Sequence, residues 1–77
     1  MQITIKYFGQ ITEVTCTTQE SLEFSGTTVG ELIDALYNKY NTLNTKDFQV
    51  AQKQELVSLE TELTGGEIAL LPPFAGG

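Results

Sequence analysis

The 77-residue sequence contains no histidine and no arginine, and its only cysteine is Cys16. Without histidine, the chain can hold neither a Ser-His-Asp triad nor a Cys-His pair. One cysteine without histidine also excludes a zinc site made of thiolates or imidazoles. A single cysteine rules out an internal disulfide framework and fits a reducing compartment. Self-contained hydrolytic chemistry of these kinds is therefore absent.

Positive charge is scarce, with four lysines against ten acidic residues and a net charge of −6. Nucleic-acid binding needs clustered Lys and Arg to displace counterions, so this balance argues against such a partner. It is compatible with docking onto a basic protein surface. The carboxylates are scattered, and Glu60 and Glu62 are interpreted as part of a solvated loop. Cys16 lacks the usual thiolate activators and is interpreted as a passive thiol.

Long apolar runs are also absent, since no stretch reaches the roughly 20 apolar residues of a membrane span. The sequence begins directly in a strand pattern, without the basic and apolar regions of a signal peptide. We therefore expect a cytoplasmic protein. A chain of this size, 40% hydrophobic and 18% charged, is typical of a globular protein. We expect residues 1–77 to form one domain with a single core.

Several short segments have the pattern of strands. Residues 1–8 alternate, with Met1, Ile3, Ile5 and Tyr7 on one face and Gln2, Thr4, Lys6 and Phe8 on the other. Gly9 ends this segment. Further strands are predicted at 21–24, 48–51, 55–57 and 67–71, with turns at 53–54 and 64–66. Residues 10–19 are predicted to be a loop with room for a short turn of helix, and residues 41–47 a loop.

Residues 28–40 are predicted to form the main helix. Thr28 and Glu31 have the spacing of a capping box, in which each side chain satisfies a free amide at the helix start. Apolar residues then recur at helical spacing and form one stripe: Val29, Leu32, Ile33, Leu36, Tyr37 and Tyr40. The stripe is predicted to be core, and the tyrosines, Tyr7 included, are interpreted as packing residues.

The predicted element order is ββαβββ. One helix with one apolar stripe must bury that stripe on one face of the sheet. We therefore expect an α+β protein of the β-grasp (ubiquitin-like) class, with a mixed sheet of about five strands and one main helix packed on one face. The order alone does not force strands 1 and 5 to pair in parallel at the centre. That pairing is the simplest way to bury the mostly apolar fifth strand.

The sequence ends in Pro72-Pro73-Phe74-Ala75-Gly76-Gly77. Paired prolines cannot continue a sheet ladder, so residues 72–77 are predicted to protrude as a tail with a stiff stem. Glycine has no Cβ and can thread where a side chain would clash. The tail therefore suits delivery of a carboxylate into another protein's pocket, although a frayed terminus without a function is the alternative. An ionised carboxylate reacts poorly as an acyl electrophile and needs activation by a partner.

Other glycines do not suggest a nucleotide site. Gly65-Gly66 lacks the Lys-Ser/Thr pair and the helix start of a phosphate-binding loop, so it is predicted to be a turn between strands.

The whole sequence resembles the small subunit of molybdopterin synthase (MoaD), a ubiquitin-like sulfur carrier. Residues 3–10 resemble the family's first strand, residues 28–32 its helix start, and Val50-Ala51-Gln52 with Leu56-Val57 its middle strands. Residues 63–77 resemble its closing signature, in which an acidic turn and a last strand lead to Pro-Pro, two variable residues and Gly-Gly. The paired prolines discriminate this family from the thiamine-pathway carrier, which usually lacks them.

The resemblance implies a cycle of reactions. A partner adenylyltransferase of the E1 type uses ATP to adenylate Gly77, and a sulfur donor protein converts the adenylate to a thiocarboxylate. The carrier then inserts its tail into the large synthase subunit, with which it forms a heterotetramer, and gives sulfur to cyclic pyranopterin monophosphate. Gly77 would be the reacting group, Pro72 and Pro73 the stem, and Phe74, Ala75 and Gly76 the threading residues. The chain itself would bind no cofactor and catalyse nothing alone.

Three other functions stay open on the sequence. The first is a sulfur carrier for thiamine, a tungsten cofactor or tRNA thiolation. The second is a ubiquitin-like protein modifier joined through Gly77 to lysines of target proteins. The third is a β-grasp interaction module with an inert tail.

Overall fold

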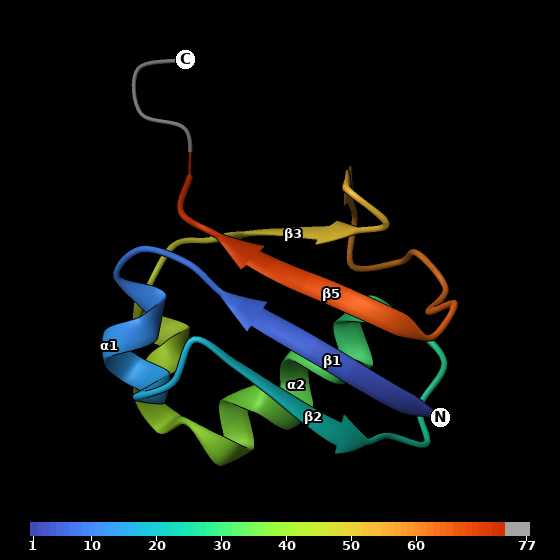
Figure 1. Ribbon diagram of the computed structural model, residues 1–77, viewed down its shortest axis with the longest axis horizontal. Helices are drawn as coiled ribbons and strands as arrows, with labels where there is room; N and C mark the ends of the chain where they lie inside the picture. Colours follow the sequence, from blue (N-terminus) through green and yellow to red (C-terminus); the bar gives the residue numbers. More distant parts are fainter. Residues whose placement is uncertain (74–77) are drawn as a thin grey trace.

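The computed structural model describes residues 1–73 (Figure 1). Its elements, in chain order, are β1 (Gln2–Tyr7), α1 (Ile11–Thr15), β2 (Gln19–Glu23), α2 (Val29–Lys39), the 3-10 helix η1 (Asn41–Thr45), β3 (Gln49–Gln52), β4 (Glu55–Val57) and β5 (Gly66–Leu71). The five strands form one sheet in the order β2-β1-β5-β3-β4. The central pair, β1 and β5, is parallel, and the other pairs are antiparallel. This is the predicted ubiquitin-like β-grasp sheet.

The main helix begins and ends as predicted. Thr28 is the N-cap, and its hydroxyl accepts a 3.3 Å hydrogen bond from the Glu31 backbone N–H. The Glu31 carboxylate in turn accepts from the backbone N–H groups of Thr27 and Thr28, at 2.8 and 3.0 Å. These bonds favour the ionised form and lower the pKa of Glu31 to about 2. The predicted capping box is confirmed.

The core lies between α2 and one face of the sheet. Four members of the predicted stripe are buried: Val29, Leu32, Ile33 and Leu36. They form one cluster with Ile3, Ile5 and Tyr7 of β1 and Ile68 and Leu70 of β5. The core prediction is confirmed for these residues, whereas Tyr37 and Tyr40 are only partly buried and pack at its margin.

Residues 10–19 contain the short turn of helix that the sequence allowed for within the predicted loop. Residues 11–15 form the helix α1, with Ile11 and Thr15 buried one turn apart. Cys16 ends α1 in a left-handed conformation (φ 60°), a position more often filled by glycine. The next strand, β2, begins at Gln19 rather than at the predicted residue 21. Gln19 and Glu20 pair with Lys6 and Ile5 of β1. The polar character of Gln19 and Glu20 hid the start of β2.

The predicted loop at residues 41–47 also contains a helix, η1, which buries Leu43. The predicted β4 is confirmed, whereas β3 lies one residue later and β5 begins one residue earlier than predicted. Lys53 and Gln54 form the β3–β4 turn with positive φ angles. Gly65 and Gly66 also have positive φ, as expected for the turn before β5. Within residues 1–73, none of the helices is long and apolar enough to cross a membrane.

Candidate functional site

The central strand β5 leads directly into the prolines that were predicted to form the stem. Leu71 is the last residue of β5, and Pro72 and Pro73 are both exposed. Figure 1 shows the chain leaving the sheet at the end of β5. The β1–β5 ladder continues one bond past Tyr7, where the N–H of Phe8 donates to the Leu70 carbonyl at 3.1 Å. The next bond of a parallel ladder would need an N–H at residue 72, and proline has none. The Phe8 carbonyl accepts instead from the N–H of Ile11, at 3.3 Å.

Two features mark the point where the chain leaves the sheet after β5. Proline stops the ladder, and the turn after β1 uses the carbonyl that the ladder leaves free. We call Pro72 and Pro73 the stem from here on. The other predicted tail residues, Phe74, Ala75, Gly76 and Gly77, lie outside the described residues, so the roles assigned to them stay predictions.

The sheet has an open face opposite α2. Along this face the strand register places Lys6, Ala69, Ala51 and Leu56 in one row across β1, β5, β3 and β4. The two alanines are small, so the middle of the row is shallow. Leu56 is 54% exposed at one end of the row. By strand alternation Phe8, which is 43% exposed, follows Lys6 on the same face.

Phe8 and Leu56 are two large apolar side chains that the fold leaves in solvent. Both lie on the open face, and Phe8 immediately follows the strand paired with β5. Lys6 pairs with Glu67 across the β1–β5 ladder at 2.9 Å and supplies polar character beside Phe8, at the end of the row opposite Leu56. The open face therefore combines exposed apolar side chains with an ion pair, a mixture that also occurs at protein-binding surfaces.

Cys16 does not lie in an activating environment. It is exposed at the C-terminal end of α1, and its Sγ lies 3.9 Å from the Glu13 carbonyl oxygen. Reactive thiolates are favoured instead at helix N-termini or beside cations. Among residues 1–73, no group of three or more His, Cys, Asp or Glu side chains is arranged to hold a metal ion.

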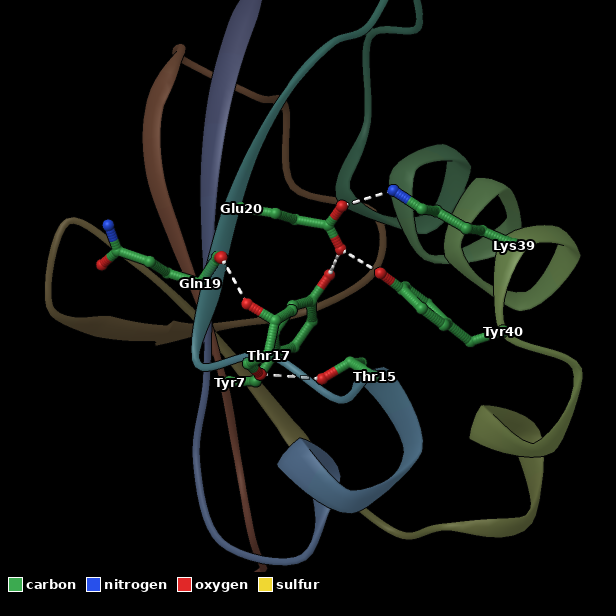
Figure 2. A network of polar contacts seen from close by, with 7 residues as sticks. All are labelled: Tyr7, Thr15, Thr17, Gln19, Glu20, Lys39 and Tyr40. Atoms are coloured by element: carbon green, nitrogen blue, oxygen red, sulfur yellow. Dashed lines mark hydrogen bonds and ion pairs between the residues drawn. The ribbon is translucent and has the colours of Figure 1, made fainter.

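A polar cluster around Glu20 ties three elements together (Figure 2). The Glu20 carboxylate of β2 accepts hydrogen bonds from the hydroxyls of Tyr7 and Tyr40, each at 2.5 Å. Its other oxygen pairs with the ammonium group of Lys39 at the end of α2. The rings of Tyr7 and Tyr40 meet edge to face, with centroids 6.2 Å apart. We call these four residues the Glu20 cluster.

The electrostatics of the Glu20 cluster follow from these contacts. Burial raises the pKa of Glu20, but the hydrogen bonds from Lys39, Tyr40 and Tyr7 outweigh it, and the net pKa is lowered. Burial and the bond to Glu20 raise the pKa of Tyr7 well above its ordinary value, and they raise that of Tyr40 as well. The bond to Glu20 raises the pKa of Lys39. The cluster fixes β2 and α2 against β1 and so supports the strand that carries Phe8.

Sequence reasoning missed the Glu20 cluster because it treated the tyrosines as packing residues only. Glu20 lies one residue before the strand predicted at 21–24, so its inward position, where an acid needs hydrogen-bond donors, was not recognised. The position of Phe8 on the non-core face was predicted, but its exposure was not recognised as part of a site. Leu56 carried no such signal, because β4 is too short to show alternation.

The described residues thus form a ubiquitin-like β-grasp domain whose central strand ends in an exposed stem. The chain belongs to the ThiS family, whose model matches residues 5–77, and it is MoaD-like within that group. It is 37% identical to the molybdopterin synthase sulfur carrier subunit of Mycobacterium tuberculosis, over an alignment that covers 100% of this chain and 99% of the relative. The resemblance inferred from the motifs is confirmed.

Two solved structures share the fold over the full length of both chains. Small archaeal modifier protein 1 from Haloferax volcanii is 26% identical, with a TM-score of 0.81. The complex of subunits 1 and 2 of the molybdopterin-converting factor from Helicobacter pylori contains a chain that is 26% identical, with a TM-score of 0.70. The fold therefore occurs both in a small archaeal modifier protein and in a complex of two subunits.

Proposed function

We propose that this chain is the sulfur carrier subunit of a molybdopterin synthase. One observation carries the proposal: the central strand ends in the exposed Pro72-Pro73 stem, within a full-length match to a sulfur carrier subunit of that enzyme. In this function Gly77 holds the sulfur as a C-terminal thiocarboxylate. The stem and the threading residues Phe74, Ala75 and Gly76 deliver it.

The chemistry requires partners. A carboxylate must first become a better acyl electrophile, and an acyl-adenylate made from ATP provides a good leaving group. Sulfide from a donor protein then attacks the acyl carbon, AMP leaves, and the carboxylate oxygen is replaced by sulfur. The likeness to a sulfur carrier subunit, rather than any active site of this chain, supports assigning adenylation to an E1-type adenylyltransferase. The chain itself then uses no cofactor and acts as a donor rather than as a catalyst.

The large subunit is proposed to bind the open face as well as the tail. The Helicobacter pylori complex pairs a chain of this fold with a second subunit. Phe8 and Leu56 supply exposed apolar side chains on the open face of the sheet. Aromatic residues such as Phe8 often carry much of the binding energy at an interface. Binding to the open face would hold the carrier while the tail enters the active site. The sulfur acceptor there is cyclic pyranopterin monophosphate.

A single-turnover transfer experiment tests the function. Carrier loaded with sulfur is mixed with the large subunit and cyclic pyranopterin monophosphate, and both products are followed by mass. We expect the carrier to lose about 16 Da, the difference between sulfur and oxygen at an acyl group, as the pterin gains sulfur. Loaded carrier that keeps its sulfur with this acceptor, but gives it up to a thiamine precursor, a tungsten-cofactor precursor or tRNA, would reassign the pathway.

A second candidate function follows from the likeness to small archaeal modifier protein 1. The same activated Gly77 can acylate a lysine amine and form an isopeptide bond instead of a thiocarboxylate. Adducts of the carrier that survive reducing gels and contain a Gly77–lysine linkage would establish this function. The two functions are distinguished by the nucleophile that attacks the adenylate.

A further inference from the structure

We propose that Gly9 is a positioning residue for the stem and sets the direction in which the tail leaves the sheet. The inference rests on the proposed function, because a tail that delivers sulfur must leave the sheet in a defined direction. Gly9 lies two residues after the end of β1 and has a φ of +62°, in the left-handed region. A Cβ placed on Gly9 would lie 3.1 Å from Cγ of Pro72 and 3.5 and 3.6 Å from its Cβ and Cδ. The first distance is shorter than an ordinary carbon–carbon contact of about 3.5–4.0 Å.

The Gly9 side of this contact is held firmly. The Gly9 carbonyl accepts from both the backbone N–H and the hydroxyl of Thr12, at 3.2 and 2.8 Å. The preceding residue, Phe8, is bonded to Leu70 of β5 and to Ile11 of α1. The turn therefore cannot move away from Pro72 to relieve a clash with a side chain at position 9 unless several of these hydrogen bonds break.

The stem side of the contact borders open space. Pro72 and Pro73 are exposed and border an open groove of about 330 Å³, whose other walls include Ile11, Lys46 and Asp47. A Cβ at position 9 would displace the Pro72 ring while leaving the core intact. Because Pro72 is the first residue of the tail, a small shift there changes the direction of everything that follows.

The test compares Gly9→Ala with Gly65→Ala. Gly65 has a φ of +83°, so alanine is strained there too, but its Cβ would meet nothing within 4 Å. Each variant is loaded with sulfur, and its single-turnover transfer rate is measured at increasing concentrations of the large subunit. We expect Gly9→Ala to lower the rate at saturation by about tenfold or more, since a 1 Å misplacement can cost on the order of 100-fold. The concentration of large subunit that gives half of the maximal rate should stay close to the wild-type value. Gly65→Ala should transfer sulfur at the wild-type rate.

Rescue provides the second arm. Pro72→Ala removes the ring atom that the new Cβ would meet. Gly9→Ala should therefore lower the transfer rate of the Pro72→Ala protein much less than it lowers the transfer rate of the wild type. An equal loss in both backgrounds, or an equal loss from Gly65→Ala, would overturn the inference.

A structural readout separates this inference from the proposed function. Nuclear Overhauser effects between the Gly9 α-protons and the Pro72 ring protons should be strong in the wild type, and those from residue 9 should change in Gly9→Ala. If the wild-type carrier transfers no sulfur, the proposed function fails. The nuclear Overhauser effects then decide by themselves whether Gly9 positions the stem. Unchanged effects in Gly9→Ala would show that it does not.

Discussion

Tyr7 of β1 donates a 2.5 Å hydrogen bond to Glu20 of β2, although the register of the two strands places Glu20 opposite Ile5. Tyr7 and Glu20 are therefore diagonal neighbours on the same face of the sheet, within reach of a long side chain. The bond places a carboxylate at an inward position of β2, and Tyr40 and Lys39 complete its partners from α2. A polar group thus links an edge strand to the main helix.

Replacing Glu20 with Gln should destabilise the fold at pH 7. Gln has one acceptor oxygen and no charge, so it cannot satisfy two tyrosine hydroxyls and an ammonium group together. We expect a loss of about 1–3 kcal/mol in the free energy of unfolding, measured with urea. Glu60→Gln, at an exposed position, is the control and should change little. Equal stabilities of the Glu20 and Glu60 variants would contradict the role of the cluster.

The advantage of wild type over Glu20→Gln should depend on pH. The pKa of Glu20 is lowered in the folded state, so its contribution is present above the unfolded value of about 4.3 and is lost as pH falls through the folded pKa. The pKa values of Tyr7 and Tyr40 are raised, so their contribution is present below about 10 and is lost as pH rises further. Urea titrations from pH 2 to 11 should show the largest difference between the two proteins at intermediate pH. A constant difference would argue against the assigned bonds.

Leu36→Ala should destabilise the domain by about 2–5 kcal/mol, because Leu36 is 1% exposed between α2 and the sheet. Leu56→Ala removes the same atoms from a side chain that is 54% exposed, and should leave the melting temperature nearly unchanged. A folded Leu36→Ala protein with a wild-type melting curve and lost partner binding would show that the stripe is a docking face.

Leu56→Ser should weaken binding to the large subunit by about tenfold, which corresponds to roughly 1.4 kcal/mol for a buried anchor. Leu59→Ser is the control, because Leu59 is also 54% exposed but lies beyond β4, where its backbone contacts the start of α2. Affinity is measured by calorimetry with sulfur-free carrier. If Leu59→Ser weakens binding more than Leu56→Ser, the interface lies over the 58–61 loop and not over the open face.

Changes at the tip of the tail should block transfer and spare the fold. Deleting Gly77, or adding one residue after it, moves the carboxylate by roughly 3.3–3.6 Å. Gly76→Val adds a branched side chain where the tail is proposed to thread, and should also impair transfer. Thermal melting should hardly change in any of these variants, since the described residues 1–73 already supply a core cluster that ends at Leu70. Near-normal single-turnover transfer from the protein lacking Gly77 would exclude the sulfur carrier function.

The parts of the fold that follow from local patterns were predictable. The spacing of Thr28 and Glu31 gave the start of α2, and the alternation of Ile3, Ile5 and Tyr7 gave the buried face of β1. The apolar character of β5 indicated its central position. In these segments the hydrophobic pattern and the backbone preference agree, so sequence alone is informative.

The remaining features depend on partners that are distant in the sequence. The start of β2 was hidden because its inward residue is Glu20, whose partners lie 13 to 20 residues away. The η1 helix was hidden because only Leu43 anchors it. The space in which a Cβ on Gly9 would meet Pro72 lies between positions at opposite ends of the chain, and no local pattern reports it. For the site, the stem was predictable from the prolines, whereas the open face required the strand register.

The location of the added sulfur tests the sulfur carrier proposal most directly. Carrier is incubated with ATP, the adenylyltransferase and a sulfide source, and the product is fragmented in a mass spectrometer. We expect a gain of about 16 Da, the exchange of oxygen for sulfur at an activated acyl group, on the fragment that contains Gly77. Cys16→Ser should gain the same mass. A gain located on Cys16, or one that disappears in Cys16→Ser, would contradict the assignment of Gly77 as the sulfur-carrying residue.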